Sequence, residues 1–176
     1  MDDELLDLVD QNDQVIGKEW RSNVHAKGLS NFRVIYTFVH NAQGQLWIPR
    51  RTAHKKLWPL RLDVGVGGHV GSGETYDEAF VREVQEEINL DVHTTTYQKL
   101  GRLTPHEHGV GFFITVYTVL TNQSPDYNKD DFIEFYWLYP HEVLERLETI
   151  DVGKPDLAKL IKYFFIHPRQ KTPMAR

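Results

Sequence analysis

Three glutamates at helical spacing are the residues of this sequence whose types and positions best suit chemistry. Glu83, Glu86 and Glu87 are three and four positions apart, so on an α-helix their carboxylates share one face. Carboxylates at that spacing repel one another, and a hard divalent cation such as Mg²⁺, which takes oxygen ligands, would convert this repulsion into binding. The alternative is an acidic helix face exposed to solvent, and the glutamates alone do not decide between the two.

A glycine-rich loop before this helix favours the functional interpretation. Five glycines fall within residues 65–73, and the loop is expected to run into a helix that starts near Thr75 and ends near Ile88. Glycine permits positive φ angles and lets the backbone approach a ligand closely. A plain turn before a helix needs only one or two glycines, so the loop indicates a binding site next to the glutamates.

The loop and the helix together resemble the signature of the Nudix hydrolase family. That signature is a glycine, five residues, a glutamate, seven residues, and then Arg-Glu-aliphatic-any-Glu-Glu-any-Gly-aliphatic. Asn89 is the one departure, since it stands where the signature has glycine. That position closes the helix, and asparagine is the next most tolerant residue of the left-handed conformation found there. The matching positions are Gly68, Glu74, Arg82, Glu83, Val84, Glu86, Glu87 and Leu90.

The resemblance implies a reaction and a metal site. Nudix enzymes hydrolyse a diphosphate joined to another group, which needs charge neutralisation and a positioned water more than a covalent nucleophile. By resemblance, the three helix glutamates would hold Mg²⁺ or Mn²⁺, and the carbonyl of Gly67 would complete the site. Glu86 and Glu87 are the strongest expected ligands, and one of them would orient or deprotonate the water. Glu83 would be the third ligand.

Arg82 is a fourth candidate for the catalytic site, and three other residues are weaker candidates. Arg82 would either contact phosphate or pair with a signature glutamate, and we favour the pairing because a cation beside carboxylates is drawn to them. Glu74 would anchor the loop or bind a further metal. Outside the signature, Glu134 resembles a late glutamate that several Nudix enzymes use near the metal, and Glu107 is a second candidate. The alternative for both is an exposed carboxylate.

A second resemblance, upstream of the signature, is to the Nudix branch related to isopentenyl diphosphate isomerase. Residues 50–59, RRTAHKKLWP, have the form of the basic segment that binds the substrate diphosphate there. Carried over by position, Arg51 and Lys55 would bind phosphate oxygens, and Arg21 is a further candidate. Arginine offers a fork of donors for this task and lysine a point charge. The alternative is a solvated basic turn.

Particular residues count against the isomerase activity itself. The isomerase needs a catalytic cysteine two positions before the loop histidine, but here that position is Gly67 and the chain has no cysteine. Its metal site uses several histidines. His25 and His69 match two of them, but Phe32 stands in the place of another, and phenylalanine cannot coordinate a metal. We expect His69 to touch substrate or metal, and His25 to have a structural or partner-contact role.

Composition is that of a soluble globular protein. The 176 residues suit one domain, with 40% hydrophobic and 26% charged residues. The formal charge of −5 gives no general basic field for nucleic acid, and the absence of cysteine excludes disulfides and thiolate chemistry. The first ten residues lack the basic start and apolar core of a signal peptide, and no run approaches the roughly 18 apolar residues that a membrane span needs. A cytoplasmic location is therefore expected.

The order of expected elements indicates an α+β sandwich, because strands and helices do not alternate regularly. The resemblance implies the Nudix form of it: an α/β/α sandwich with a curved mixed sheet, here with an N-terminal β-hairpin extension. We expect an N-terminal hairpin and link at 1–31, a Nudix domain at 32–167 that forms one globular unit with it, and a flexible tail at 168–176. Strands are expected at 5–9, 15–20, 32–40, 45–51, 91–103, 112–120 and 131–138, further helices at 22–27, 141–147 and 156–165, and loops at 65–73 and 104–109.

Three functions stay open at this point. The first is a Mg²⁺-dependent hydrolase of a nucleoside diphosphate derivative or a related small diphosphate. The second is a relative of isopentenyl diphosphate isomerase, which the missing cysteine disfavours. The third is a non-catalytic module that binds a ligand, which has no need to keep Arg82 and the three glutamates in this array. No nucleic acid or membrane partner is expected, and the hairpin could either support a homodimer through its edge or cover its own sheet.

Overall fold

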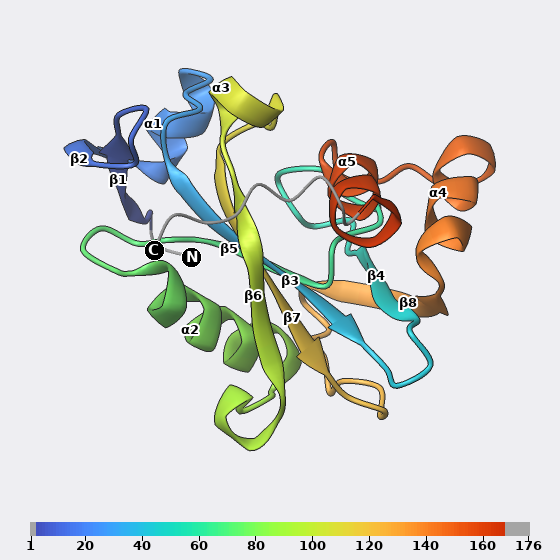
Figure 1. The fold of residues 1–176 in the computed structure, drawn as a ribbon. Helices are drawn as coiled ribbons and strands as arrows, with labels where there is room; N and C mark the ends of the chain where they lie inside the picture. Colours follow the sequence, from blue (N-terminus) through green and yellow to red (C-terminus); the bar gives the residue numbers. More distant parts are fainter. Residues whose placement is uncertain (1–2, 168–176) are drawn as a thin grey trace.

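The computed structural model describes residues 3–167, and a mixed β-sheet lies at the centre of this part of the chain (Figure 1). The strands of the sheet are β3 (Arg33–His40), β4 (Leu46–Arg51), β5 (Val66–His69), β6 (Tyr97–Leu103), β7 (Phe113–Leu120) and β8 (Phe132–Leu138). They run in the order β6-β7-β3-β4-β8, and β5 pairs with β3 beside this path. β3 and β7 are parallel, and the other pairs are antiparallel. The tail predicted at 168–176 lies outside the described residues.

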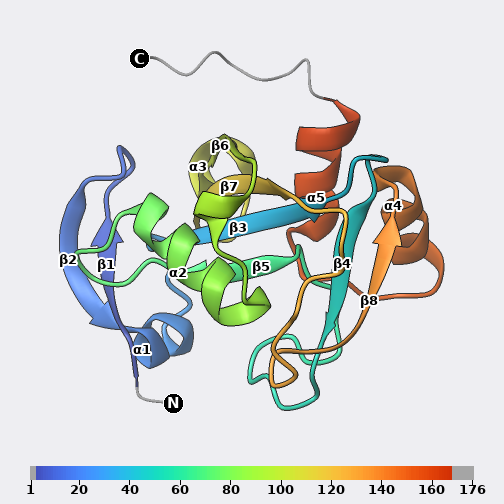
Figure 2. The ribbon, with the colours of Figure 1, turned by 90° about the horizontal axis from the view of Figure 1, so that it is seen from below.

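Helices cover both faces of this sheet (Figure 1 and Figure 2). On one face lies α2 (Tyr76–Ile88), whose Val84 packs in a core with Ile35 of β3. On the other face lie α4 (Pro140–Thr149) and α5 (Leu157–Ile161), and α5 continues into one π-helical turn, Lys162–Ile166. Leu160 of α5 packs in a second core with Phe38 of β3. Alternate residues of a strand point to opposite faces, so β3 supplies both cores. The predicted α+β sandwich is confirmed.

The expected glycine-rich loop at 65–73 is partly a strand, which corrects the prediction. Residues of β5 pair with β3, with Gly67 opposite Tyr36 and Gly68 opposite Ile35. Glycine disfavours strands in general, which is why the composition suggested a loop. Here the close approach of neighbouring groups excludes a side chain: a Cβ on Gly67 would lie 2.7 Å from Cδ1 of Tyr36. β5 thereby places the backbone of Gly67 and Gly68 next to α2.

Two further segments also differ from expectation. The loop expected at 104–109 contains a short helix, α3 (Pro105–His108), in which Pro105 occupies a first-turn position and Gly109 ends the turn at φ 61°. The strand expected at 91–103 begins only at Tyr97, because the Asp91 side chain accepts from the His93 N–H at 2.9 Å and starts a 3-10 turn, Val92–Thr94. Both differences come from local capping. Capping outweighs the strand-forming composition at 91–96 and the loop-forming composition at 104–109.

The predicted N-terminal hairpin is confirmed as β1 (Leu5–Val9) and β2 (Val15–Trp20), followed by α1 (Arg21–Ala26). β1 lies next to the loop before α2, and its Asp7 accepts hydrogen bonds from Ser72 Oγ at 2.8 Å and from the Gly73 N–H at 2.9 Å. At the hairpin turn, Asp13 binds Arg33 at 2.6 Å and Arg102 at 2.7 Å. The hairpin therefore packs on its own chain and supports the loop that leads into α2.

None of the helices formed by residues 3–167 is long and apolar enough to cross a membrane.

Candidate active site

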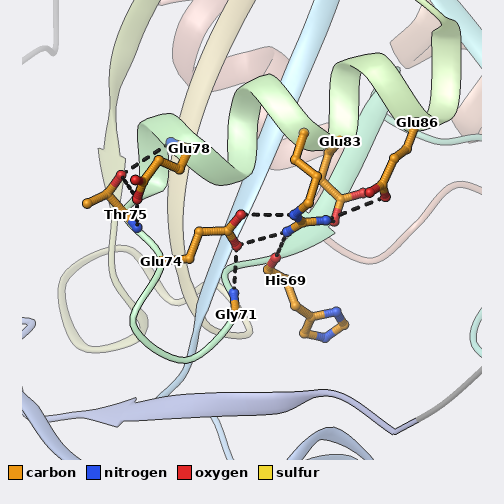
Figure 3. Close-up of polar contacts among 8 residues, drawn as sticks. His69, Gly71, Glu74, Thr75, Glu78, Glu83 and Glu86 are labelled. Carbon is orange, nitrogen blue, oxygen red and sulfur yellow. Dashed lines mark hydrogen bonds and ion pairs between the residues drawn. The ribbon is translucent and has the colours of Figure 1, made fainter.

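The start and end of α2 are set by its own capping residues. Thr75 Oγ1 accepts from the Glu78 N–H at 3.2 Å, and the Glu78 carboxylate accepts from the Thr75 N–H at 2.8 Å, which is a complete capping box (Figure 3). At the other end, Asn89 adopts the left-handed conformation, with φ 49° and ψ 38°, and its N–H donates to the carbonyl of Gln85. Asparagine thus closes the helix in the way expected for this departure from the signature.

Arg82 is bonded to groups from the loop and the helix, and Figure 3 labels three of its partners, His69, Glu74 and Glu83. Its Nε and Nη2 donate to the two carboxylate oxygens of Glu74, each at 2.9 Å. Nη1 donates to Glu83 at 2.6 Å, and Nη2 also donates to the carbonyl of His69 at 3.0 Å. Glu74 in turn accepts from the Gly71 N–H at 2.8 Å. These bonds agree with a role for Arg82 in pairing with the signature glutamates and a role for Glu74 in anchoring the loop.

Glu83 and Glu87 point from α2 toward β5 and contact its glycines. A Cβ on Gly68 would lie 1.9 Å from Cδ of Glu83, so this carboxylate fits only against glycine. Glu87 is only 8% exposed, and its Oε2 accepts from the Gly67 N–H at 3.1 Å. Two of the three helix glutamates predicted as ligands, Glu83 and Glu87, are therefore in direct contact with the loop glycines.

Burial raises the pKa of both carboxyl groups. The pKa of Glu83 is raised to about 7, because the cost of burial outweighs the neighbouring Arg82 guanidinium, which lowers it. The pKa of Glu87 is raised well above its ordinary value, first by burial and then by the charge of Glu83. Two adjacent buried carboxyl groups without enough positive charge around them are a place where a cation is stabilised.

This donor set fits a hard divalent cation. Carboxylate oxygens are the ligands that Mg²⁺ takes in proteins, and it is usually held by one or two of them. Glu83 and Glu87 meet that requirement, and Glu86, which is exposed and lies 3.5 Å from Nη1 of Arg82, borders them. In residues 3–167, no three acidic, histidine or cysteine side chains already converge as a metal site, because Glu83 is turned to Arg82 and Glu87 to the backbone of Gly67.

The basic segment predicted to bind phosphate lies beside these carboxylates. Arg51, at the end of β4, donates from Nη1 to Asp63 at 2.7 Å, and Lys55 pairs with Asp131. Asp63 and Asp131 both raise the pKa of Glu87, whereas Lys55 lowers it, so these three charged groups are close enough to act on Glu87. The structure thus places Lys55 near Glu87, and it links Arg51 to the same region through Asp63.

His25 and His69 meet on the α1 side of β5. Their Nε2 atoms are 3.1 Å apart, and Phe32 stacks on the His69 ring with centroids at 5.6 Å. Burial lowers the pKa of both imidazoles, that of His69 well below its usual value, so the two neutral rings share one hydrogen bond. Arg21 lies nearby on α1 and approaches Glu4 at 3.8 Å. The resemblance to the isomerase matched both histidines to one metal site, and in the structure their rings are in contact.

Glu134 and Glu107 belong to other contacts. Glu134, on β8, pairs with Arg50 and accepts from Tyr136 Oη at 2.7 Å, and these bonds lower its pKa. Glu107 is exposed on α3, 3.8 Å from Nδ1 of His108. Neither carboxylate is among the groups that contact Glu83 or Glu87 in the described part of the chain.

Two charged residues near the site were missed by sequence reasoning. Asp63 is 2% exposed and joins Arg51 to Lys154, whose Nζ lies 3.1 Å from Asp63 Oδ1. A single aspartate inside the apolar run at 62–66 is a signal of a buried, paired carboxylate and could have identified Asp63. Lys154 lies between a glycine and a proline far along the chain and carries no such signal.

The sequence was compared with known families and proteins. Residues 31–163 match the family model described as the NUDIX domain. The chain belongs to the Nudix family. This match includes α4 and α5. The predicted class of enzyme, a Nudix-type pyrophosphohydrolase, is therefore confirmed.

Close relatives agree with this assignment. A protein of Nostoc sp. named as an uncharacterized Nudix hydrolase is 51% identical over 92% of this chain and 96% of its own length. A Nudix hydrolase of Deinococcus radiodurans is 41% identical over 91% of this chain and 93% of its own. A crystal structure of a Deinococcus radiodurans protein superposes with a TM-score of 0.86, at 40% identity, over 90% of this chain and 98% of that one. An isopentenyl-diphosphate delta-isomerase of Kocuria rhizophila is 23% identical over 83% of each chain.

Proposed function

We propose that this Nudix enzyme is a Mg²⁺-dependent hydrolase that cleaves a phosphoanhydride in a nucleoside diphosphate derivative or a related small diphosphate. One observation carries this proposal: the largely buried Glu83 and the buried Glu87 lie against Gly68 and Gly67 with raised pKa values. A bound divalent cation would stabilise the charged form of two such neighbouring carboxyl groups. Mn²⁺ has the same ligand preference and could replace Mg²⁺.

The proposed metal ligands are the helix glutamates and the carbonyl of Gly67. Glu83 and Glu87 would hold the cation from the buried side, and Glu86 from the exposed side. When bound, the cation supplies charge neutralisation of the phosphates and lowers the pKa of a coordinated water. Glu86 or Glu87 would orient this water or take its proton. Arg82 would act by holding Glu83 in place, because its nitrogens are already bonded to Glu74, Glu83 and His69.

The proposed phosphate ligands are Arg51 and Lys55. Lys55 and the Asp63 partner of Arg51 both act on the pKa of Glu87, which supports a diphosphate that contacts the two cations and reaches the proposed metal site. Arg21 and His69 are proposed as further substrate contacts at the α1 side of β5. Glu134 and Glu107 are not proposed for the site, since their contacts lie elsewhere.

A substrate panel tests this function. Wild-type protein would be assayed with Mg²⁺ and with Mn²⁺ on nucleoside di- and triphosphates, nucleotide sugars, ADP-ribose, dinucleotides, CoA and prenyl diphosphates. Release of phosphate or of a nucleoside monophosphate with one of these, abolished by a chelator, is the expected result. No turnover of any compound by folded protein that binds metal would contradict the proposal.

The isomerase is the second candidate, and the pairing of His25 with His69 and the Kocuria rhizophila relative favour it. Gly67 and Phe32 disfavour it, because they replace the thiol and a metal-binding histidine that the isomerase requires. Phe32 is buried and packs on both imidazoles. Interconversion of isopentenyl and dimethylallyl diphosphate, followed in the same panel, distinguishes the two reactions.

A further inference from the structure

A buried lysine, Lys154, lies beside the proposed site without a role in it. It is 7% exposed and sits in the segment between α4 and α5. The backbone of this segment is fixed, because Lys154 N–H donates to the carbonyl of Leu62 at 2.9 Å and Leu62 N–H donates to that of Val152 at 3.0 Å. The ammonium lies 3.1 Å from Asp63 and 4.4 Å from the centroid of the Tyr36 ring. Its position is therefore well defined.

Lys154 and Arg51 share one carboxylate. Asp63 receives Arg51 Nη1 on Oδ2 at 2.7 Å and Lys154 Nζ on Oδ1 at 3.1 Å. The three groups carry two positive charges and one negative charge, and all are largely buried. In addition, Nε of Arg51 is buried and has no hydrogen-bond partner among residues 3–167. Buried charges are normally paired, so this group has one cation more than its own carboxylate balances.

Tyr36 connects this charged group to the strand that carries the proposed site, because its ring contacts both Lys154 and Gly67. Tyr36 lies opposite Gly67 in the pairing of β3 with β5, and a Cβ on Gly67 would be 2.7 Å from its ring. The same ring is contacted by Lys154, and the N–H of Gly67 is bonded to Glu87. Lys154 is thus separated from the Glu87 region by one aromatic ring and one glycine.

We propose that Lys154 is a substrate-binding residue whose ammonium, with Arg51, binds a phosphoryl oxygen of the diphosphate, and that Asp63 positions both cations. This role rests on the proposed function, because it places the diphosphate between these cations and the signature glutamates. The anion would supply the negative charge that the group of Arg51, Lys154 and Asp63 lacks. A purely structural lysine would serve only to neutralise Asp63, which Arg51 already does.

Binding of inorganic diphosphate tests this role without requiring turnover. Titration calorimetry with Mg²⁺ would compare wild type, Lys154→Met and Lys154→Arg, with Lys162→Met on the exposed side of the π-helical turn as matched control. Methionine keeps the length of the side chain and leaves Arg51 and Asp63 as a balanced pair, so the variant is expected to fold. We expect binding about 10-fold weaker or more in Lys154→Met, partly recovered in Lys154→Arg and unchanged in Lys162→Met, as for loss of a charge-assisted hydrogen bond.

Equal affinity of wild type and Lys154→Met would overturn the role of Lys154. If Lys154→Met does not fold, a crystal structure of the wild type with Mg²⁺ and diphosphate decides: Lys154 Nζ within about 3.2 Å of a phosphate oxygen supports the role, and Nζ without a phosphate contact overturns it. The proposed function fails separately. If Lys154→Met binds diphosphate weakly but the wild type hydrolyses nothing, the binding role of Lys154 stands and the hydrolase is rejected. If the wild type hydrolyses a substrate but both proteins bind diphosphate equally well, the hydrolase stands and the role of Lys154 is rejected.

Discussion

The backbone of Gly68 and the carboxylate of Glu83 occupy adjacent space, with no room for a methyl group between them. A Cβ on Gly68 would lie 1.9 Å from both Cδ and Oε1 of Glu83. Gly68→Ala must therefore displace a proposed metal ligand. We expect kcat/KM to fall by about 100-fold, since misplacement of a reacting group by about 1 Å has effects of this size.

Gly17→Ala is the matched control for this change, because nothing lies within 4 Å of a Cβ at that position. It should leave kcat/KM within about twofold of wild type, as surface substitutions do. Steady-state kinetics of both variants, with circular dichroism to verify folding, provides the comparison. A Gly68→Ala enzyme with wild-type kcat/KM would show that Glu83 need not stay where the structure places it.

The raised pKa of Glu83 predicts how stability depends on pH without metal. Its ordinary pKa is 4.5 and its folded pKa is about 7, so between these values the folded state binds more protons than the unfolded state. The free energy of unfolding contributed by this group therefore falls as pH rises through that window, by at most about 1.4 kcal/mol per pH unit. Glu83→Gln removes the titration and should become progressively more stable than wild type from about pH 5 to pH 7.

Urea denaturation of wild type and Glu83→Gln at several pH values, in a chelator, measures this difference. His25 and His69 titrate in both proteins, so their effects cancel in the comparison. Added Mg²⁺ should stabilise the wild type more as pH rises, because the cation needs the carboxylate form. A difference between the two proteins that does not change with pH would contradict a raised pKa of Glu83 in the folded state.

Asp63→Asn should be strongly destabilising. It removes the carboxylate that contacts both Arg51 and Lys154 and leaves two buried cations next to each other. The loss of one partner from a buried ion pair costs about 3–5 kcal/mol, and we expect a loss in the free energy of unfolding of that size. Asp130→Asn, at an exposed position in the neighbouring loop, is the control and should change stability by less than about 0.5 kcal/mol. Equal stability of the two variants would reject the buried charge group.

Asp13→Ala should loosen the N-terminal hairpin. Asp13 binds Arg33, Arg102 and the hydroxyl of Tyr76, the last at 3.1 Å. Hydrogen bonds to charged groups contribute about 1.5–3 kcal/mol, so we expect a loss of about 2 kcal/mol in stability and faster amide exchange in β1 and β2. If the hairpin and the Nudix domain are one unit, as we propose, exchange should also rise in the loop at 71–74. Faster exchange in β1 and β2 alone would indicate that they unfold separately.

The strands and the signature helix were predictable because their signals are local. The run at 32–40 is β-branched and aromatic, and α2 carries its own capping box at Thr75 and its own left-handed end at Asn89. β5 was not predictable, because its glycines disfavour a strand and only the contacts with Tyr36 and Glu83 explain them. Capping at Thr104 likewise outweighed the loop-like composition of 104–109.

In the site, residue types were predictable and their partners were not. The spacing of Glu83 and Glu87 placed them on one face, but their burial depends on β5, which lies about 20 positions earlier. The contact of His25 with His69 joins residues 44 positions apart, and no local pattern encodes it. Lys154 reaches Asp63 from a segment at the far end of the domain, so only the fold reveals the pair.

The rate of phosphoanhydride hydrolysis by Glu87→Gln, relative to wild type on the best substrate at saturating Mg²⁺, tests the central claim most directly. Glutamine keeps the shape of this buried side chain but cannot be a carboxylate ligand, and loss of a raised-pKa carboxyl should not destabilise the fold. We predict a fall in kcat of about 100-fold or more, with Glu148→Gln, an exposed glutamate of α4, unchanged. Wild-type turnover by a folded Glu87→Gln enzyme would contradict the assignment of the signature glutamates as the metal site.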